Sequence, residues 1–147
     1  MKSRREFLAD ACKLCMVAVS AGSILTLLDG CGGEKAITAT STGKAHEVKI
    51  PLSLFEGTVK RVLVDVPGSD KQVLAIKKAD GSYSALKLSC THKGVGLKME
   101  ANQLSCPAHG STFDYEGNVT HGPAARSLKI YTTSVSDTDL LIQTDDL

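Results

Sequence analysis

Two short loops, each with one cysteine and one histidine, constrain the fold of this chain more than any other feature of its sequence. The first reads Cys90-Thr91-His92 and the second reads Cys106-Pro107-Ala108-His109, with thirteen residues between them. Thiolates and imidazoles are common metal ligands, and four of them brought together form a metal site. The fold must therefore place these two loops side by side.

The order of the ligands separates two kinds of metal site. A zinc finger usually has its two Cys together and its two His together, whereas here the two types alternate. Alternation suits a two-iron cluster in which one iron takes two Cys and the other takes two His. Gly94, Gly96 and Gly110 allow the loop backbone to come close to inorganic sulfides. A structural zinc site in a binding module is the alternative.

The rest of the domain is predicted to be all-β. Beyond Glu47 the apolar residues recur with a period near two, and turn residues separate the short runs. The expected strands are residues 58–66, 72–77, 82–88, 127–131 and 139–144. Asp80-Gly81 predicts a tight hairpin between the second and third of them, and Glu116-Gly117-Asn118 predicts another turn. No ten residues after position 46 have helical spacing, so the pattern indicates a sandwich or small barrel.

The first 31 residues are predicted to be an export signal. A charged segment, residues 1–13, precedes an apolar one, residues 14–28, which is shorter than the ~20 residues of a full membrane span. Ser3-Arg4-Arg5-Glu6-Phe7-Leu8 resembles the twin-arginine export motif. Leu28-Asp29-Gly30-Cys31 resembles a lipobox, in which Cys31 is lipidated. An uncleaved membrane anchor is the alternative.

Residues 32–46 are rich in Gly, Ser, Thr and Ala without apolar periodicity, which predicts a flexible tether. The domain is then expected over residues 47–147. Four basic and three acidic side chains lie in the first 30 residues, which leaves thirteen of each in the remaining 117. A neutral domain without a basic stripe argues against nucleic acid as a partner.

The two loops resemble the ligand motifs of the Rieske [2Fe–2S] family, C-x-H in one loop and C-x2-H in the other. Gly122-Pro123-Ala124 resembles the proline loop that covers the cluster, and Ser111-Thr112-Phe113-Asp114 fits the strand after the second loop. The resemblance extends over residues 86–131. It implies an all-β fold of stacked antiparallel sheets with a small cluster-binding subdomain over residues 88–126.

The resemblance also implies a cofactor and its ligands. Cys90 and Cys106 would bind the inner iron of a [2Fe–2S] cluster, and His92 and His109 the outer, solvent-near iron. Two neutral imidazoles in place of two thiolates raise the reduction potential, to about −150 to +300 mV against about −400 mV for plant-type ferredoxins. The implied function is one-electron transfer, and no catalytic residue or substrate site is evident.

Two positions in the proposed cofactor environment bear on its reduction potential. Ser111 matches the family position whose hydroxyl hydrogen-bonds a bridging sulfide. Phe113 replaces a Tyr that would supply a second hydroxyl near a Cys ligand. We therefore expect an intermediate potential, with Gly122 and Pro123 in the loop that covers the cluster. His121 and His46 match no ligand position and are expected to be solvated.

Three departures from the family pattern guide the choice of partner. Respiratory members carry a further Cys in each loop, joined as a disulfide, and here these places hold Val95 and Ala108. Lys93 follows the first His, where quinol-oxidising members are commonly apolar. Together with the lipobox and the tether, these features favour an electron carrier, or the small subunit of a periplasmic oxidoreductase, at the outer face of the cytoplasmic membrane. Its partner would be a cytochrome or a larger oxidoreductase subunit.

Two further functions are possible from the sequence. Ser111 and the Gly-Pro-Ala loop are compatible with the Rieske subunit of a quinol–cytochrome complex of the bc type. A zinc-stabilised binding module without a redox role is the alternative of another class.

Overall fold

The computed structural model describes residues 36–145, which form strands and one 3₁₀ turn, η1 (Leu52–Phe55). The strands are β1 (Ile37–Thr38), β2 (Thr40–Ser41), β3 (Glu47–Pro51), β4 (Arg61–Asp65), β5 (Gln72–Lys77), β6 (Tyr83–Lys87), β7 (Lys98–Met99), β8 (Leu104–Ser105), β9 (Thr112–Phe113), β10 (Val119–His121), β11 (Ile130–Tyr131), β12 (Thr133–Ser136) and β13 (Asp139–Gln143). Within this part of the chain, no helix is long and apolar enough to cross a membrane. The predicted all-β fold is confirmed.

The five-stranded sheet β1-β4-β5-β6-β11 is covered on both faces. Along β5, Val73 and Ala75 enter one hydrophobic core, and Leu74 and Ile76 enter another. A strand that is buried on both faces reads as a continuous apolar run, which explains the sequence of residues 72–77. The sheet therefore carries two cores, one on each side.

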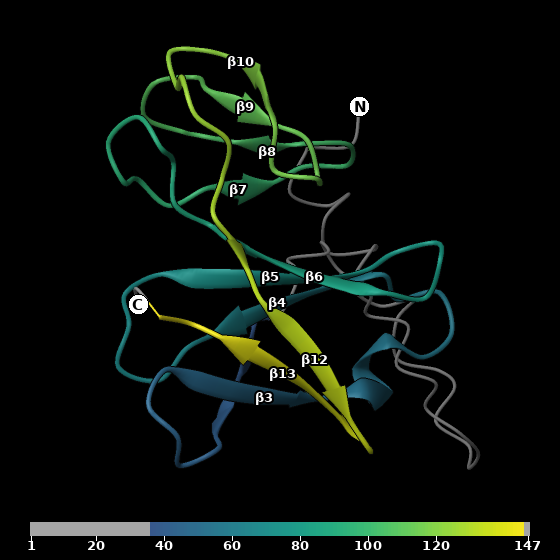
Figure 1. Ribbon diagram of the computed structural model, residues 1–147. Coiled ribbons are helices and arrows are strands. Elements are labelled where there is room, and N and C mark those ends of the chain that lie inside the picture. Colours follow the sequence, from purple (N-terminus) through teal and green to yellow (C-terminus); the bar gives the residue numbers. More distant parts are fainter. Residues whose placement is uncertain (1–35, 146–147) are drawn as a thin grey trace, which may run out of the picture. The chain divides into compact units, whose positions relative to one another are not determined.

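The first core lies in the part of the molecule that we call the base, residues 36–87 and 129–145. There the sheet β12-β13-β3-β2 supplies Val48, Ile50, Leu140 and Ile142 against the five-stranded sheet. The ladders are long: β4 pairs with β5, and β13 with β3, over five residues each. Figure 1 shows the base as the lower part of the domain.

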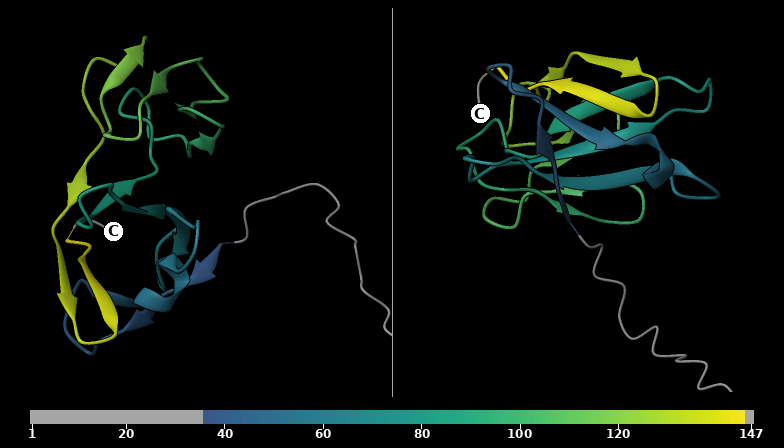
Figure 2. Two further views of the ribbon diagram at one scale, coloured as in Figure 1. Left: turned by 90° about the vertical axis from the view of Figure 1, so that its right-hand side faces the viewer. Right: turned by 90° about the horizontal axis from the view of Figure 1, so that it is seen from below.

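The second core lies under the cluster region, residues 88–128, which contains the sheet β10-β9-β8-β7. Its strands are only two or three residues long, and they lie together beyond the base (Figure 1 and Figure 2). Leu104 and Phe113 pack here with Leu86 of the five-stranded sheet, as do both loop cysteines. This region matches the small subdomain that the resemblance implies.

The predicted turns are present, and each contains a glycine with a positive φ. The β5–β6 hairpin closes at Asp80-Gly81, and a second turn contains Gly117, whose φ is +89°. This φ favours glycine, and a Cβ on Gly117 would lie 3.2 Å from Leu86 Cδ2, so the Leu86 side chain would have to shift to admit it. The strand expected over residues 127–131 is shorter, because Leu128 N–H donates to the Gly117 carbonyl instead of joining a ladder.

The predicted tether over residues 32–46 differs from the structure where residues are described. Ile37–Thr38 pairs in parallel with β4, and Thr40–Ser41 pairs antiparallel with β3. Ala39 between them is 4% exposed and enters the first core. The domain boundary predicted at Glu47 is therefore too late in the chain. Strands of two residues have no apolar periodicity, which is why the sequence did not predict them. The predictions for Arg4, Arg5 and Cys31 lie outside the described residues.

Candidate metal centre

Loop 1 (residues 90–96) turns back on itself through two backbone hydrogen bonds. Cys90 N–H donates to the Val95 carbonyl at 2.8 Å, and Gly94 N–H donates to the Cys90 carbonyl at 2.7 Å. Gly94 has a φ of +71°, in the left-handed region that favours glycine. The cysteine is thereby fixed at the start of a closed turn.

Loop 2 (residues 106–111) repeats this pattern with a different sequence. Cys106 N–H donates to the Ser111 carbonyl at 2.8 Å, and Gly110 N–H donates to the Cys106 carbonyl at 3.0 Å. Gly110 has a φ of +75°. The two loops thus present their Cys and His side chains from equivalent backbone turns.

The two cysteines face each other in the second core. Cys90 is 1% exposed and Cys106 is 2% exposed, and neither forms a disulfide. Burial raises the pKa of the Cys106 thiol, but hydrogen bonds from the His109 and Ala108 backbone N–H groups and with the Cys90 thiol outweigh it and leave the pKa below its ordinary value. The thiolate is the form that binds metals.

The two histidines form the second pair. The ring centroids of His92 and His109 are 4.8 Å apart, and the planes are nearly perpendicular at 88°. His92 Nδ1 is buried without a hydrogen-bond partner, whereas His109 is exposed. An unsatisfied buried nitrogen costs free energy unless it binds something. Its lone pair fits a metal.

The donors therefore meet as a Cys pair and a His pair, and each loop gives one member to each pair. This is the donor set of a two-iron cluster with two protein ligands per iron. Within residues 36–145, no three His, Cys, Asp or Glu side chains surround one point as ligands of a single ion. The residues present fit the [2Fe–2S] cluster.

Ser111 connects loop 2 to the proline loop. Its side chain is fully buried, and its Oγ accepts a hydrogen bond from Ala124 N–H at 3.0 Å. The hydroxyl proton remains available to a further acceptor, so the contact is compatible with the predicted bond to a sulfide. Gly122 and Pro123, joined by a cis peptide bond, are exposed in this loop.

Thr91 makes a second connection that the sequence did not predict. Its Oγ1 donates to the Arg126 carbonyl at 2.5 Å, which ties loop 1 to the end of the proline loop. The partners are 35 residues apart in the chain, and no local pattern indicates such a contact. The sequence likewise did not predict that the backbone N–H groups of Ala108 and His109 donate hydrogen bonds to the Cys106 sulfur.

The other predicted residues lie around this centre or away from it. Phe113 is fully buried in the second core. Lys93 is exposed on loop 1. His121, on β10, and His46, before β3, are both exposed, as predicted.

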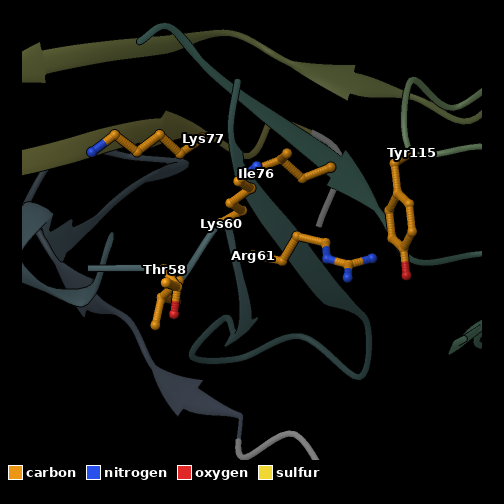
Figure 3. Close-up of a pocket in the computed structure, with 7 residues that line it drawn as sticks. Thr58, Lys60, Arg61, Ile76, Lys77 and Tyr115 are labelled. Atoms are coloured by element: carbon orange, nitrogen blue, oxygen red, sulfur yellow. The ribbon is translucent and has the colours of Figure 1, made fainter. Parts of the chain in front are cut away.

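A cavity of about 450 Å³ lies away from these donors and contains none of them. In Figure 3 the Arg61 side chain extends toward Tyr115, and its guanidinium carbon is 4.1 Å from the ring centroid. The lining residues are Thr58, Val59, Lys60, Arg61, Ile76, Lys77 and Tyr115.

Comparisons with known proteins identify the family of this chain. A family model described as the Rieske [2Fe-2S] domain matches residues 44–132. The cytochrome b6-f complex iron-sulfur subunit of Synechococcus sp. (strain JA-3-3Ab) is 30% identical over 142 residues, which cover 90% of this chain and 82% of that protein. Subunit 1 of the same complex from Synechocystis sp. (strain ATCC 27184 / PCC 6803 / Kazusa) is 36% identical over 99 residues, which cover 63% of this chain and 55% of the relative.

Solved structures show the same fold. The cyanobacterial plasma membrane Rieske protein PetC3 from Synechocystis PCC 6803 superposes with a TM-score of 0.52 at 27% identity, over 63% of this chain and 93% of that one. Naphthalene 1,2-dioxygenase, at 20% identity, shares the fold with a TM-score of 0.52, over 66% of this chain and 26% of that one. The chain spans 55% to 65% of the length of the first three curated relatives. The chain belongs to the Rieske [2Fe–2S] family, and its cofactor is a [2Fe–2S] cluster.

Proposed function

We propose that Cys90, Cys106, His92 and His109 hold the cluster, the cysteines on the inner iron and the histidines on the outer iron. The observation that carries this proposal is the pairing of thiol with thiol and of ring with ring across two equivalent loops. The cluster, when bound, supplies a reversible one-electron couple. The protein acts as an electron carrier or as the small subunit of a periplasmic oxidoreductase.

The path of the electron follows from burial. The Cys side of the centre lies inside the second core, whereas His109 reaches the surface. Because electron transfer needs close approach of the two centres, the partner docks on the histidine side. The backbone N–H groups of Ala108 and His109 stabilise negative charge on the Cys106 sulfur.

The experiment that tests this function is chemical analysis of the purified full-length protein. Two irons and two acid-labile sulfides per chain, visible absorbance and a reversible one-electron wave in protein-film voltammetry support it. A colourless protein loaded with one zinc ion would contradict it and favour the binding module.

The location of the protein is also a proposal, supported by sequence motifs alone. Residues 1–31 direct export through the twin-arginine route, and lipid on Cys31 holds the domain at the outer face of the cytoplasmic membrane. The double variant Arg4→Lys/Arg5→Lys should stay in the cytoplasm. Cys31→Ala should abolish lipid labelling and release the domain; continued membrane attachment would indicate a retained anchor or a partner.

A second candidate is the Rieske subunit of a cytochrome complex. It is favoured by the relatives that are cytochrome b6-f iron-sulfur subunits. The exposed Lys93 beside His92 favours the carrier instead, because a charged side chain there opposes docking against an apolar subunit. Affinity capture from solubilised membranes separates the two: a stoichiometric cytochrome b supports the complex, and its absence supports the carrier.

A further inference from the structure

Three segments meet at the histidine end of the cluster region: loop 1, loop 2 and the proline loop (residues 121–127). The Thr91–Arg126 and Ser111–Ala124 hydrogen bonds join the proline loop to loop 1 and loop 2, respectively. The His ring contact joins loops 1 and 2 directly. In Figure 1 the corresponding connections, after β6, β8 and β10, lie together on the left of the upper part. We call this surface the tip.

The tip carries positive charge without carboxylates. No Asp or Glu occurs in the three segments, whereas Lys93 and Arg126 are both exposed there. The ion pairs among residues 36–145 include neither of these two side chains. Asp70, in a turn that borders a small cavity with Gly96 of loop 1, is already paired with Lys71 at 2.8 Å.

The tip also lacks large exposed apolar side chains. In the described part of the chain these are Val59, Ile130 and Val135, and none lies in the three segments. A partner that docks on the tip therefore meets small residues, two prolines, the imidazoles of His109 and His121, and two cations. A surface with carboxylates opposite Lys93 and Arg126 would match it.

The net charge of the domain as a whole does not oppose this local charge. Residues 31–147 hold thirteen Lys and Arg against thirteen Asp and Glu, so their net charge is zero. For a neutral body, the charge near the contact decides whether an approaching partner is attracted. Because an electron acceptor must reach the exposed edge of His109, it passes through the field of Lys93 and Arg126.

We propose that the tip is the docking surface for a redox protein with an acidic contact face, with Lys93 and Arg126 as its recognition residues. This inference rests on the proposed function, because it takes the histidine side as the point of electron exit. It adds the chemistry of the partner, which the ligand set alone does not specify.

The test uses two oxidants that share a haem and differ in charge: native horse cytochrome c, which is basic, and the same protein with surface lysines converted to carboxylates. The second-order rate of oxidation of the reduced, cluster-loaded protein is measured with each by stopped flow. The readout is the ratio of the acidic to the basic rate, in which any change in the protein's own potential cancels. At ~10 mM salt, where the Debye length is ~30 Å, we expect a ratio of about ten or more.

The matched control for the single variant Lys93→Glu is Lys78→Glu, which makes the same charge change away from the tip. The first residue of β5, Gln72, lies near loop 1, because its carbonyl accepts a hydrogen bond from Leu88 N–H. Lys78 follows the opposite end of the same strand. That separation is roughly 20 Å at ~3.4 Å per residue. The variants are compared at ~100 mM salt, where the Debye length of ~10 Å is shorter than this separation. We expect Lys93→Glu/Arg126→Glu to bring the ratio below one, Lys93→Glu alone to lower it at least about threefold, and Lys78→Glu to change it less than about twofold.

Two results would overturn the docking surface while leaving the proposed function intact. One is a loaded wild-type protein that reduces both oxidants at equal rates, or the basic one faster, in low salt. The other is a shift of the ratio by Lys78→Glu that equals the shift by Lys93→Glu. Protein without iron, or without transfer to either oxidant, would overturn the proposed function together with the docking surface.

Discussion

The base and the cluster region use different means to hold their structure. Base strands reach five or six residues, form long ladders, and enclose a core with Ile50, Val64, Leu140 and Ile142. Cluster-region strands have two or three residues, and their core includes the two thiols of Cys90 and Cys106. Hydrophobic burial can stabilise the base alone, whereas the cluster region buries a His92 nitrogen that has no hydrogen-bond partner among the described residues.

The contrast is clearest in the polar atoms that each region buries. In the base, Glu47 is 6% exposed but accepts hydrogen bonds from Thr42 at 2.8 Å and from Gln143 at 2.5 Å. In the cluster region, His92 Nδ1 is buried without any partner. Because metal binding to such a site is coupled to folding, loss of the metal should loosen one region and spare the other.

The largest effect is expected from the ligands. Cys90→Ser, His92→Ala, Cys106→Ser and His109→Ala should each lose the whole cluster, because a missing ligand leaves an iron open to hydrolysis. Iron and acid-labile sulfide analysis measures this. The control is His121→Ala, which removes an exposed imidazole of the same region and should keep full occupancy. Full iron content in any ligand variant would remove that residue from the site.

Removal of the metal should separate the two regions directly. After iron is removed with acid and chelator, we expect amide hydrogen exchange in residues 88–128 to speed up by at least about tenfold, a loss of local stability above ~1.4 kcal/mol. Protection in β4, β5 and β13 should persist. Equal loss of protection in both regions would show that the base does not fold independently of the site.

A substitution in the base should have the opposite result. Leu140 is fully buried in the first core, and Leu140→Ala should destabilise the protein by about 2–5 kcal/mol. Denaturant unfolding measures the loss, and iron per folded chain should remain unchanged. A different result would contradict this: the variant loses iron at denaturant concentrations where its base is still folded, whereas the wild type keeps its iron under the same conditions. The packing of the base would then also control the site.

Ser111→Ala should change the potential while leaving the ligands in place. A charge-assisted hydrogen bond is worth ~1.5–3 kcal/mol, and 59 mV corresponds to ~1.4 kcal/mol for one electron, so the potential should fall by about 60–130 mV. Phe113→Tyr should raise it by a smaller step. Protein-film voltammetry measures both potentials. A shift below ~20 mV for Ser111→Ala would mean that Ser111 has only a structural role, through its hydrogen bond with Ala124.

The smallest effect concerns acid and the base. The hydrogen bond from Thr42 is the main cause that holds the pKa of Glu47 below its usual 4.5, helped by Gln143 and Lys44. Because its pKa is lower in the folded state, the ionised Glu47 carboxylate stabilises the fold fully above pH ~4.5. This contribution is lost as the pH falls through the lower pKa of the folded state. Glu47→Gln should therefore lower Tm at pH 7 and converge with wild type at acid pH. A constant Tm difference from pH 7 to pH 2 would contradict this.

The sequence predicted those features that rest on local patterns. Alternation along β4, the Asp80-Gly81 hairpin and the two ligand loops all depend on residues a few positions apart. The strands at residues 37–41 were not predicted, because pairing of two residues with distant partners leaves no periodic signal. The Thr91–Arg126 and Ser111–Ala124 contacts join segments far apart in the chain, and only the fold brings them together.

The most direct test of the central claim is the number of histidines bound to the cluster. Pulsed electron paramagnetic resonance of the reduced protein, labelled with ¹⁵N in histidine only, counts the nitrogens coupled to the unpaired electron. We expect two strongly coupled nitrogens, one each from His92 and His109, and the same two in His121→Ala. A paramagnetic centre with one coupled histidine nitrogen or none would contradict the ligand set.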